Sequence, residues 1–340
     1  MTSPEVGVLF GALVARALDG WWRDLGEPDP FVVVDAGAGR GRLAADVLRV
    51  PPGCAPALRY VLAERSSALR AQQRELLELE PPDRALGPVL STASDEPPVP
   101  VTGLGPIVTS LAELPAIVFD GVVIANELLD NLPFTVVEWD GDAWFEVRVG
   151  IGDGGLVEVL VPASPELAVE ADRVGAGAIP EPRDRLPVPV ATADWLVRVG
   201  EVLRRGYLAV IDYADAAASL LARGQDGWLR TYRLHERGGP PIVDPGSQDI
   251  TADVPVEHLV TVVERAGFRL RAHTTQQEWL IALGVEELAD AGARTWRERA
   301  SVGDLEAVAA RSRVHEADAL TDPAGLGAHR VFVFEKGGPG

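Results

Sequence analysis

With 340 residues, of which 47% are hydrophobic and 24% charged, the chain is typical of a globular protein with one large or two small domains. Its net charge of −20 disfavours nucleic acid as a partner, and a single cysteine, Cys54, excludes an internal disulfide and a cysteine-built zinc site. No apolar run is long enough to cross a bilayer, and residues 1–5 do not begin a secretory signal, so we expect a cytoplasmic protein without a membrane span.

Strands and helices are predicted to alternate over residues 1–134. Apolar residues recur at helical spacing from 5 to 25. Short apolar, often β-branched runs predict strands at 31–36, 58–63, 107–110 and 121–125. Amphipathic runs predict a helix that ends near Val50 and another at 68–79. Residues 83–106 are rich in proline and are predicted as a loop with a short strand at 88–90.

The hydrophobic period changes to two at Thr135. Runs at 135–139, 144–149 and 156–161 are separated by turns rich in glycine and aspartate, a pattern that predicts an antiparallel meander. We assign 135–190 to this meander and a proline-rich connector.

The α/β alternation returns over residues 191–340. Helices are predicted at 193–204, 256–266, 276–283, 285–291 and 303–313, and strands at 207–211, 268–274 and 330–335. Residues 214–256 are predicted as a long polar loop, and a loop of this length is often functional. The alternation implies a mainly parallel sheet with its ligand at the carboxyl ends of the strands, and the final strand could pair antiparallel.

A glycine series follows the first predicted strand. Asp35 is followed by Gly37, Gly39 and Gly41 and then by a helical pattern, which is the opening of a nucleotide-type βαβ unit. Arg42 stands where a dinucleotide loop of the form G-x-G-x-x-G would carry its last glycine. The spacing therefore favours S-adenosylmethionine (SAM), with Ala38 also in the loop, over a pyrophosphate cofactor.

Two acidic segments complete the candidate site. Glu64, followed by Arg65, ends the second strand at the distance expected for an acid that binds ribose hydroxyls. Asn126, Glu127 and Asp130 follow the strand at 121–125. Asn126 could cap a helix that has Asp130 in its first turn. Alternatively, Glu127 and Asp130 could hold a guanidinium by paired hydrogen bonds and accept a proton during methyl transfer.

The motifs together resemble the MidA-like SAM-dependent methyltransferases, a family that includes a mitochondrial complex I assembly factor. The most specific match is Ala125 to Pro133, which is similar to the signature A-N-E-[FL]-[FL]-D-[AN]-L-P. Further matches are found at residues 2–11, 35–41, 211–213, 229–235, 244–251, 275–284 and 320–323. Asp35 replaces the usual glutamate, Ala214 replaces a glycine after Asp212-Tyr213, and Asp253 replaces a histidine.

The resemblance implies a Rossmann-like class I methyltransferase whose Rossmann-like domain is formed by residues 1–134 and 191–340, with loops and helices of the second segment covering the substrate. It implies SAM as cofactor and an arginine-bearing protein segment as acceptor. No metal site is expected, because the histidines are scattered and lack metal-type spacing. The SAM-binding residues would be Asp35, Gly37, Ala38, Gly39, Gly41, Glu64, Arg65 and Asn126. Glu127, Asp130 and Asn126 would act in catalysis, and Asp212, Tyr213, His235 and Asp249 would contact the substrate.

Three alternatives stay open at the level of the sequence. A non-catalytic assembly factor could keep the fold and bind a partner. A methyltransferase could act on a small molecule instead of a protein. A nicotinamide-dependent oxidoreductase is disfavoured by Arg42 and by the lack of a clear hydride-transfer constellation. Oligomeric state cannot be predicted from the sequence.

Overall fold

The computed structural model describes residues 2–87, 102–233 and 236–337. The chain divides into two compact units. Unit 1 contains Met1–Asn126, Val199–Ile211 and Phe268–Gly340, and unit 2 contains Glu127–Arg198 and Asp212–Gly267. The predicted strand at 88–90 lies outside the described residues.

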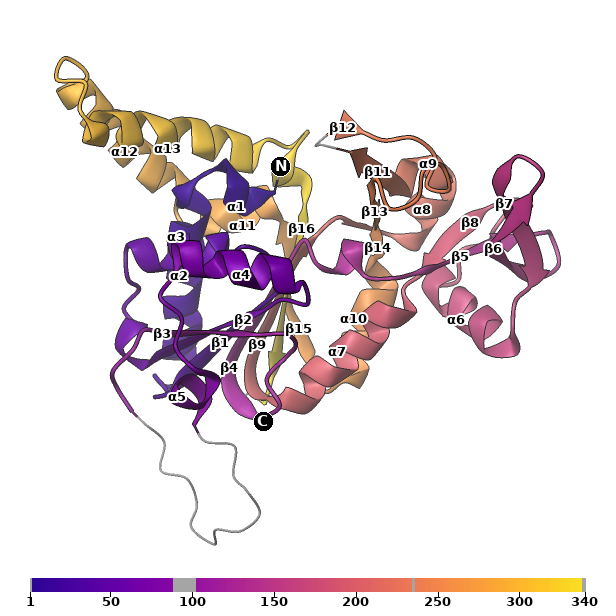
Figure 1. Cartoon of the computed structure of the whole chain (residues 1–340), viewed down its shortest axis with the longest axis horizontal. Coiled ribbons are helices and arrows are strands. Elements are labelled where there is room, and N and C mark those ends of the chain that lie inside the picture. The colour runs from indigo at the N-terminus through magenta and orange to yellow at the C-terminus, as the bar shows by residue number, and fades with distance from the viewer. Residues whose placement is uncertain (1, 88–101, 234–235, 338–340) are drawn as a thin grey trace, which may run out of the picture. The chain divides into compact units, whose positions relative to one another are not determined.

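Unit 1 is built on a seven-stranded sheet with the order β15-β16-β9-β4-β1-β2-β3 (Figure 1). The strands are β1 (Phe31–Ala36), β2 (Leu58–Ala63), β3 (Ile107–Leu111), β4 (Phe119–Asn126), β9 (Leu203–Asp212), β15 (Arg269–Thr275) and β16 (Arg330–Lys336). The strands from β3 to β9 pair in parallel, whereas β15 and β16 pair antiparallel. The predicted α/β class with a mainly parallel sheet and an antiparallel final strand is therefore confirmed.

Helices of unit 1 accompany this sheet (Figure 1). They are α1 (Ser3–Val6), α2 (Val8–Asp24), α3 (Arg42–Arg49), α4 (Ser67–Leu76), α5 (Pro82–Leu86), α11 (Gln276–Ala282), α12 (Val285–Arg299) and α13 (Leu305–Thr321), with short 3₁₀ turns η1 (Ala55–Ala57) and η3 (Leu326–Ala328). Of these, α12 and α13 pack mainly against each other. Phe10 and Leu13 of α2 share one core cluster with Phe31 of β1. Gly11 lets α2 cross close to α3, because a Cβ there would lie 2.5 Å from Cβ of Asp46.

Unit 2 contains a four-stranded antiparallel sheet in the order β7-β6-β5-β8. Its strands are β5 (Thr135–Trp139), β6 (Trp144–Gly152), β7 (Gly155–Pro162) and β8 (Arg185–Val188), and α6 (Pro165–Gly175) packs against it. Trp144 anchors this contact by donating its indole N–H to Asp172 at 2.9 Å. The predicted connector at 163–189 is thus partly regular, since it supplies both α6 and β8.

The predicted loop at 214–256 is also more ordered than the sequence indicates. After α7 (Val190–Val202) and β9, it forms β10 (Ala214–Asp215), α8 (Ala217–Arg223), α9 (Gln225–Trp228), β11 (Leu229–Arg233), β12 (Glu236–Arg237), β13 (Asp249–Ala252) and β14 (Val254–Pro255), followed by α10 (Val256–Arg265). Long-range pairing produces these strands: β11 lies between β12 and β13, and β10 pairs with β14. Each run is too short to be recognised without its partner.

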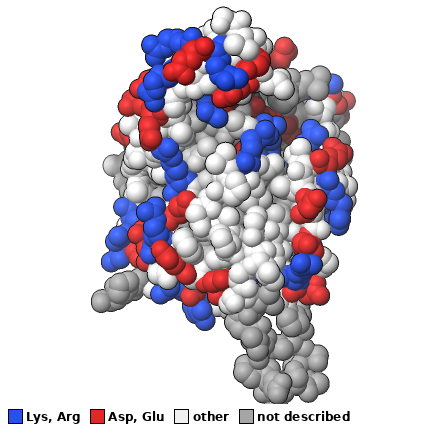
Figure 2. Space-filling model, turned by 90° about the vertical axis from the view of Figure 1, so that its left-hand side faces the viewer, with Lys and Arg blue, Asp and Glu red and all other residues white. Residues whose placement is uncertain are grey.

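The surface mixes charges of both signs. On the face drawn in Figure 2, Lys and Arg side chains lie among Asp and Glu side chains around a broad uncharged area. The described residues on this face therefore do not form a continuous basic surface. Among the residues that the structure places, no helix is long and apolar enough to span a membrane.

Candidate functional site

Three strand ends of unit 1 meet at one edge of the sheet. Ala36, the last residue of β1, pairs with Ala63 of β2 on one side and with Ala125 of β4 on the other. The glycine loop, Glu64 and Asn126 follow these three residues directly. The order of strands reverses between β1 and β4, and this is the place where open α/β sheets bind their ligands.

The glycine loop depends on backbone conformations that favour glycine. Gly37, Gly39 and Gly41 have φ angles of 72°, 53° and 80°, in the left-handed region. The N–H groups of Gly37 and Ala38 donate to the carbonyl of Ala63 at 2.8 and 3.2 Å and fix the loop to the end of β2. No described atom lies within 4 Å of the position that a Cβ on Gly39 would take. The loop therefore presents open main chain to a ligand.

Glu64 connects this loop to the start of α4. Its two carboxylate oxygens accept hydrogen bonds from the N–H of Gly39 at 3.0 Å and of Ser66 at 2.8 Å. A carboxylate offers about four acceptor positions, so the half-buried group retains lone pairs for two ribose hydroxyls. This arrangement is compatible with the predicted ribose-binding role of Glu64, and that role stays a prediction.

Gln73 of α4 is a supporting residue that the sequence analysis missed. Its buried carboxamide donates to the carbonyl of Gly39 at 2.8 Å and accepts from the hydroxyl of Ser110 at 2.6 Å. The loop is therefore held from both sides, by Glu64 and by Gln73. The only signal available in the sequence was the position of Gln73 in the helix that follows Glu64.

Asp35 and Arg65 occupy different environments beside the loop. Asp35 is buried in β1, and the hydroxyl of Tyr60 donates to it at 3.3 Å. Burial raises the pKa of Asp35 to about 7, the charge of Glu64 acts in the same direction, and the Tyr60 hydrogen bond opposes both. Arg65 is exposed, and its carbonyl accepts from Arg70 at 2.8 Å. A cofactor contact of the Arg65 side chain stays a prediction.

The segment after β4 is strained and is not the capped helix that the sequence allows. Glu127 has φ of 51°, and a left-handed conformation costs a non-glycine residue on the order of 1–2 kcal/mol. Residues Leu129–Asn131 form the 3₁₀ turn η2, whose N-cap position is held by Leu128. The alternative with Asn126 as N-cap is therefore wrong. Strain of this kind is concentrated at functional sites.

A buried carboxyl pair lies in unit 2. Asp212, which ends β9, accepts from the N–H groups of Leu129 at 2.8 Å, Asp130 at 3.4 Å and Tyr213 at 2.9 Å. It thus takes the capping role at η2. Asp130 and Asp212 also hydrogen-bond to each other, and a bond between two carboxyl groups needs a proton.

The pair shares that proton because both carboxyl groups are buried. Burial raises the pKa of Asp130 to about 6. Burial also raises the pKa of Asp212 well above its ordinary value, and the charges of Asp130 and Glu127 add to this effect. The hydrogen bond lowers the pKa of Asp130 and raises that of Asp212, so Asp212 is the member that keeps the shared proton when Asp130 ionises.

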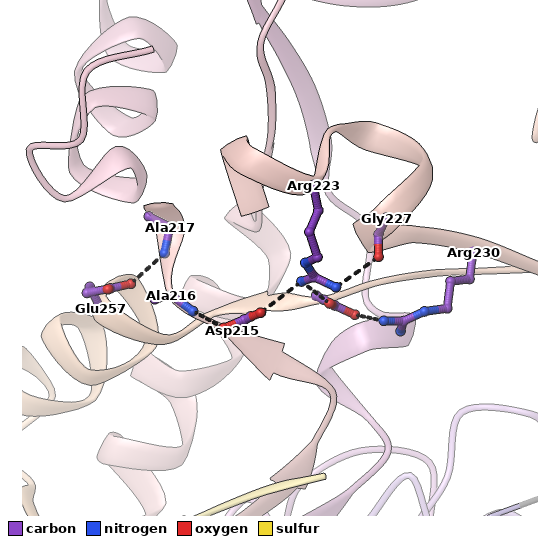
Figure 3. A network of polar contacts seen from close by, with 8 residues as sticks. Asp215, Ala216, Ala217, Arg223, Gly227, Arg230 and Glu257 are labelled. Atoms are coloured by element: carbon purple, nitrogen blue, oxygen red, sulfur yellow. Dashed lines mark hydrogen bonds and ion pairs between the residues drawn. The ribbon is translucent and has the colours of Figure 1, made fainter. Parts of the chain in front are cut away.

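An ionic network that includes Arg223, Arg230 and Asp215 (Figure 3) influences this pair through charge. The guanidinium of Arg230 lies 4.7 Å from the ring centroid of Tyr213 and binds Asp253 at 2.6 Å. Arg223 bridges Asp253 at 2.8 Å and Asp215 at 3.1 Å. The charge of Arg230 lowers the pKa of Asp130, whereas the charge of Asp253 raises it. Arg230 therefore favours the ionised form of Asp130.

The sequence analysis did not assign roles to Arg223, Arg230 or Asp253. Asp253 was visible only as a departure from the family pattern, where a histidine is common. The structure shows its consequence: Asp253 is 4% exposed, and as a carboxylate it pairs with two guanidinium groups, which a histidine cannot do.

The structure describes three of the four predicted substrate-contacting residues. Asp212 and Tyr213 belong to the carboxyl cluster. Asp249 is exposed at the start of β13, where it pairs with Tyr232 in the ladder. His235 lies outside the described residues. Within the described ranges, no group of three or more His, Cys, Asp or Glu residues could hold a metal ion.

Comparisons with known proteins point to one family. The sequence model of a family described as "putative S-adenosyl-L-methionine-dependent methyltransferase" matches residues 13–274. A crystal structure of a "likely methyl transferase" from Burkholderia thailandensis, bound to S-adenosyl-homocysteine, is 28% identical with a TM-score of 0.76, and the match covers 100% of this chain and 79% of that one. The ligand of that structure is the demethylated form of SAM, the cofactor that the glycine spacing favours.

Curated relatives are named protein arginine methyltransferase NDUFAF7 or its homologue. The Xenopus tropicalis protein is 25% identical over 84% of this chain and 65% of its own length. The Drosophila melanogaster homologue is 28% identical over 78% and 60%, and the human protein is 28% identical over 76% and 57%. The matched region is therefore less than two thirds of the length of these relatives.

The prediction of a cytoplasmic location is contradicted by these comparisons, because the curated relatives are named as mitochondrial proteins. That prediction depended on a single cysteine and on the residues at the start of the sequence. A low cysteine count indicates a reducing environment, which is not unique to the cytoplasm, and it therefore could not identify a compartment.

Proposed function

The chain belongs to the family of SAM-dependent methyltransferases whose sequence model spans residues 13–274, and from this premise we propose that it methylates an arginine side chain of a protein partner. The observation that carries the proposal is the strained Glu127 in the segment that also supplies Asp130, one member of the buried Asp130–Asp212 pair. The names of the curated relatives support the same acceptor.

The cofactor half of the proposal depends on the edge of the unit 1 sheet. When bound, SAM supplies an electrophilic methyl group on a sulfonium centre. The open main chain at Gly37 to Gly41 would accommodate it, and the carboxylate of Glu64 would accept hydrogen bonds from ribose hydroxyls. Asn126 follows the neighbouring strand end and is proposed as a further contact.

The acceptor half depends on the acidic groups that follow β4 and β9. A guanidinium is held best by carboxylates that accept paired N–H bonds. Glu127 contributes one negative charge, and the proton-sharing pair Asp130–Asp212 contributes a second. One negative charge balances the cationic guanidinium. The second belongs to a carboxylate that can accept the proton released as the nitrogen is methylated. Fixed alignment of the nucleophile would supply much of the rate.

The proposal is tested in two steps on the full chain. Isothermal titration with SAM should show binding, and an absence of binding by the folded protein would contradict the cofactor half. Tritium should then pass from labelled SAM into a protein of a cell lysate. Label confined to small molecules would indicate a small-molecule acceptor, and SAM binding without any transfer would indicate a non-catalytic assembly factor.

A further inference from the structure

Strands β6 and β7 form a hairpin in unit 2 (Figure 1), and this hairpin exposes an unusual concentration of aliphatic side chains. Six large hydrophobic residues between 149 and 160 are at least 39% exposed: Val149 at 58%, Ile151 at 91%, Leu156 at 39%, Val157 at 40%, Val159 at 42% and Leu160 at 44%. Single exposed aliphatic residues are ordinary, but a contiguous group of this size marks an interaction surface.

These side chains lie on both faces of the hairpin. The ladder pairs Ile151 with Leu156 and Val147 with Leu160, so Val149, Ile151, Leu156 and Leu160 share one face. Val157 and Val159 lie on the other face, above two glycines of β6: a Cβ on Gly150 would be 2.8 Å from Val159, and one on Gly152 would be 2.9 Å from Val157. A partner that packs on one face alone would leave the other exposed.

β7 is also an edge strand. It ends the sheet order β7-β6-β5-β8, and within the described residues no strand pairs with its outer side. Proteins usually protect such an edge with lysines, bulges or a very short strand. β7 has eight residues and a single charged side chain, Glu158, whose carboxylate binds Arg185 at 2.9 Å. The edge is therefore long, apolar and without an unpaired charge.

We propose that β7 pairs antiparallel with β7 of a second copy of this chain, so that two four-stranded sheets join into one across a two-fold axis. A second β7 offers an extended backbone edge that can form a ladder, and it carries aliphatic side chains on both faces of that edge. Two-fold symmetry places β7 of one copy beside β7 of the other, so the exposed β7 side chains Leu156, Val157, Val159 and Leu160 of each copy lie beside those of its partner.

Charge and area are compatible with self-association through this strand. The chain as a whole carries −20, which opposes contact between copies, but Glu158 approaches with its charge balanced by Arg185. A specific interface buries on the order of 1,000 Å² or more in total. The four exposed aliphatic residues of β7 and its eight-residue backbone edge, contributed by both copies, would form the centre of such an interface. The inference is independent of the proposed methyl transfer.

Sedimentation equilibrium of the full chain between micromolar and hundred-micromolar concentration tests the proposal. We expect a monomer–dimer equilibrium that Leu160→Lys weakens by at least tenfold, because a charge enters the new sheet. Ile281→Lys is the matched control, since Ile281 in α11 is 43% exposed and Leu160 is 44% exposed. Unchanged melting by circular dichroism verifies that both variants fold.

Three results would overturn the proposal: a wild-type chain that stays monomeric throughout, a dimer that Leu160→Lys does not weaken, or equal weakening by Ile281→Lys. Spin labels give a second test, because Cys54 is the single cysteine and is buried. In a Cys54→Ala background, labels on Val159→Cys should be within about 20 Å of each other across paired strands. A longer separation in a dimeric sample would contradict strand pairing.

Discussion

The glycine loop of unit 1 and the carboxyl cluster of unit 2 are built in opposite ways. The loop is local in sequence, is formed mainly by main chain, and is held by short hydrogen bonds to Ala63, Glu64 and Gln73. The cluster brings together like-charged side chains from distant segments, and each depends on the protonation of the others. Changes in the loop should therefore alter affinity for the cofactor, whereas changes in the cluster should alter rate and pH dependence.

The largest expected effect is that of Glu127→Gln on turnover. Loss of a carboxylate that holds the acceptor and takes up a proton should reduce the rate by about 10²- to 10⁴-fold, while SAM affinity stays within error of the wild type. Tritium transfer and titration with SAM measure the two quantities. The control is Glu264→Gln, at an exposed position in α10. A variant at Glu127 with normal turnover would remove this residue from the mechanism.

Gly39→Val should disrupt the glycine loop, the other region of this comparison. Its side chain would occupy the open space above the loop and force an L-residue into φ of 53°, so we expect SAM affinity to fall by about 100-fold or more, or nearly 3 kcal/mol. Gly303→Val carries a similar backbone strain, at φ of 65°, and also has no described atom near its Cβ position. Titration should find SAM affinity unaffected in that control, and an equal loss in both variants would assign the effect to stability.

The pH dependence of methyl transfer should report the carboxyl cluster. The pKa of Asp130 is raised to about 6, and the ionised form is the one that binds a guanidinium. The value of kcat/KM should therefore fall about tenfold per pH unit below that point and level off above it.

Two variants should shift the acidic side of this kcat/KM profile in opposite directions along the pH axis. Arg230→Gln removes a charge that lowers the pKa of Asp130 and should shift the acidic side to higher pH. Asp253→Asn removes a charge that raises it and should shift the acidic side to lower pH. Shifts of the same sign in both variants would contradict the network as described.

The remaining expected effect is on stability and not on binding or turnover. Asp35 has a folded pKa of about 7 against an ordinary 3.8, so the folded protein keeps a proton that the unfolded chain releases. The free energy of unfolding should therefore fall as pH rises from about 4 to 7, by at most about 4 kcal/mol from this group. Asp35→Asn should make that dependence shallower in urea titrations at several pH values, and Asp226→Asn, at an exposed position, should not.

The same contrast explains what could be predicted from the sequence. β1 and β2 match the predicted strands at both ends because each is a short, largely apolar run that is bounded by turn residues. The glycine loop and Glu64 could be identified because they follow two consecutive strands that also pair in the sheet. The number of residues between them is therefore typical of a nucleotide-type βαβ unit. The role of each as a SAM contact stays a prediction.

Strands and site residues that depend on contacts with distant segments of the chain could not be predicted from the sequence. The strands β8, β11 and β13 form only by pairing with segments that are distant in the sequence. The roles of Arg230 and Asp253 depend on folding, which brings them close to Tyr213 and Asp130. α6 could have been found, since Ser164 and Pro165 are a standard helix start and the Ser164 hydroxyl accepts from Leu167 N–H at 3.2 Å.

The central claim is that the carboxyl cluster selects an arginine side chain of a protein as methyl acceptor. Amino-acid analysis of protein labelled by tritiated SAM, with Glu127→Gln as the matched inactive enzyme, tests it most directly. The account predicts that the label is recovered as methylarginine and that it disappears with the variant. Label recovered on another amino acid, or an equal yield of methylarginine from the variant, would contradict it.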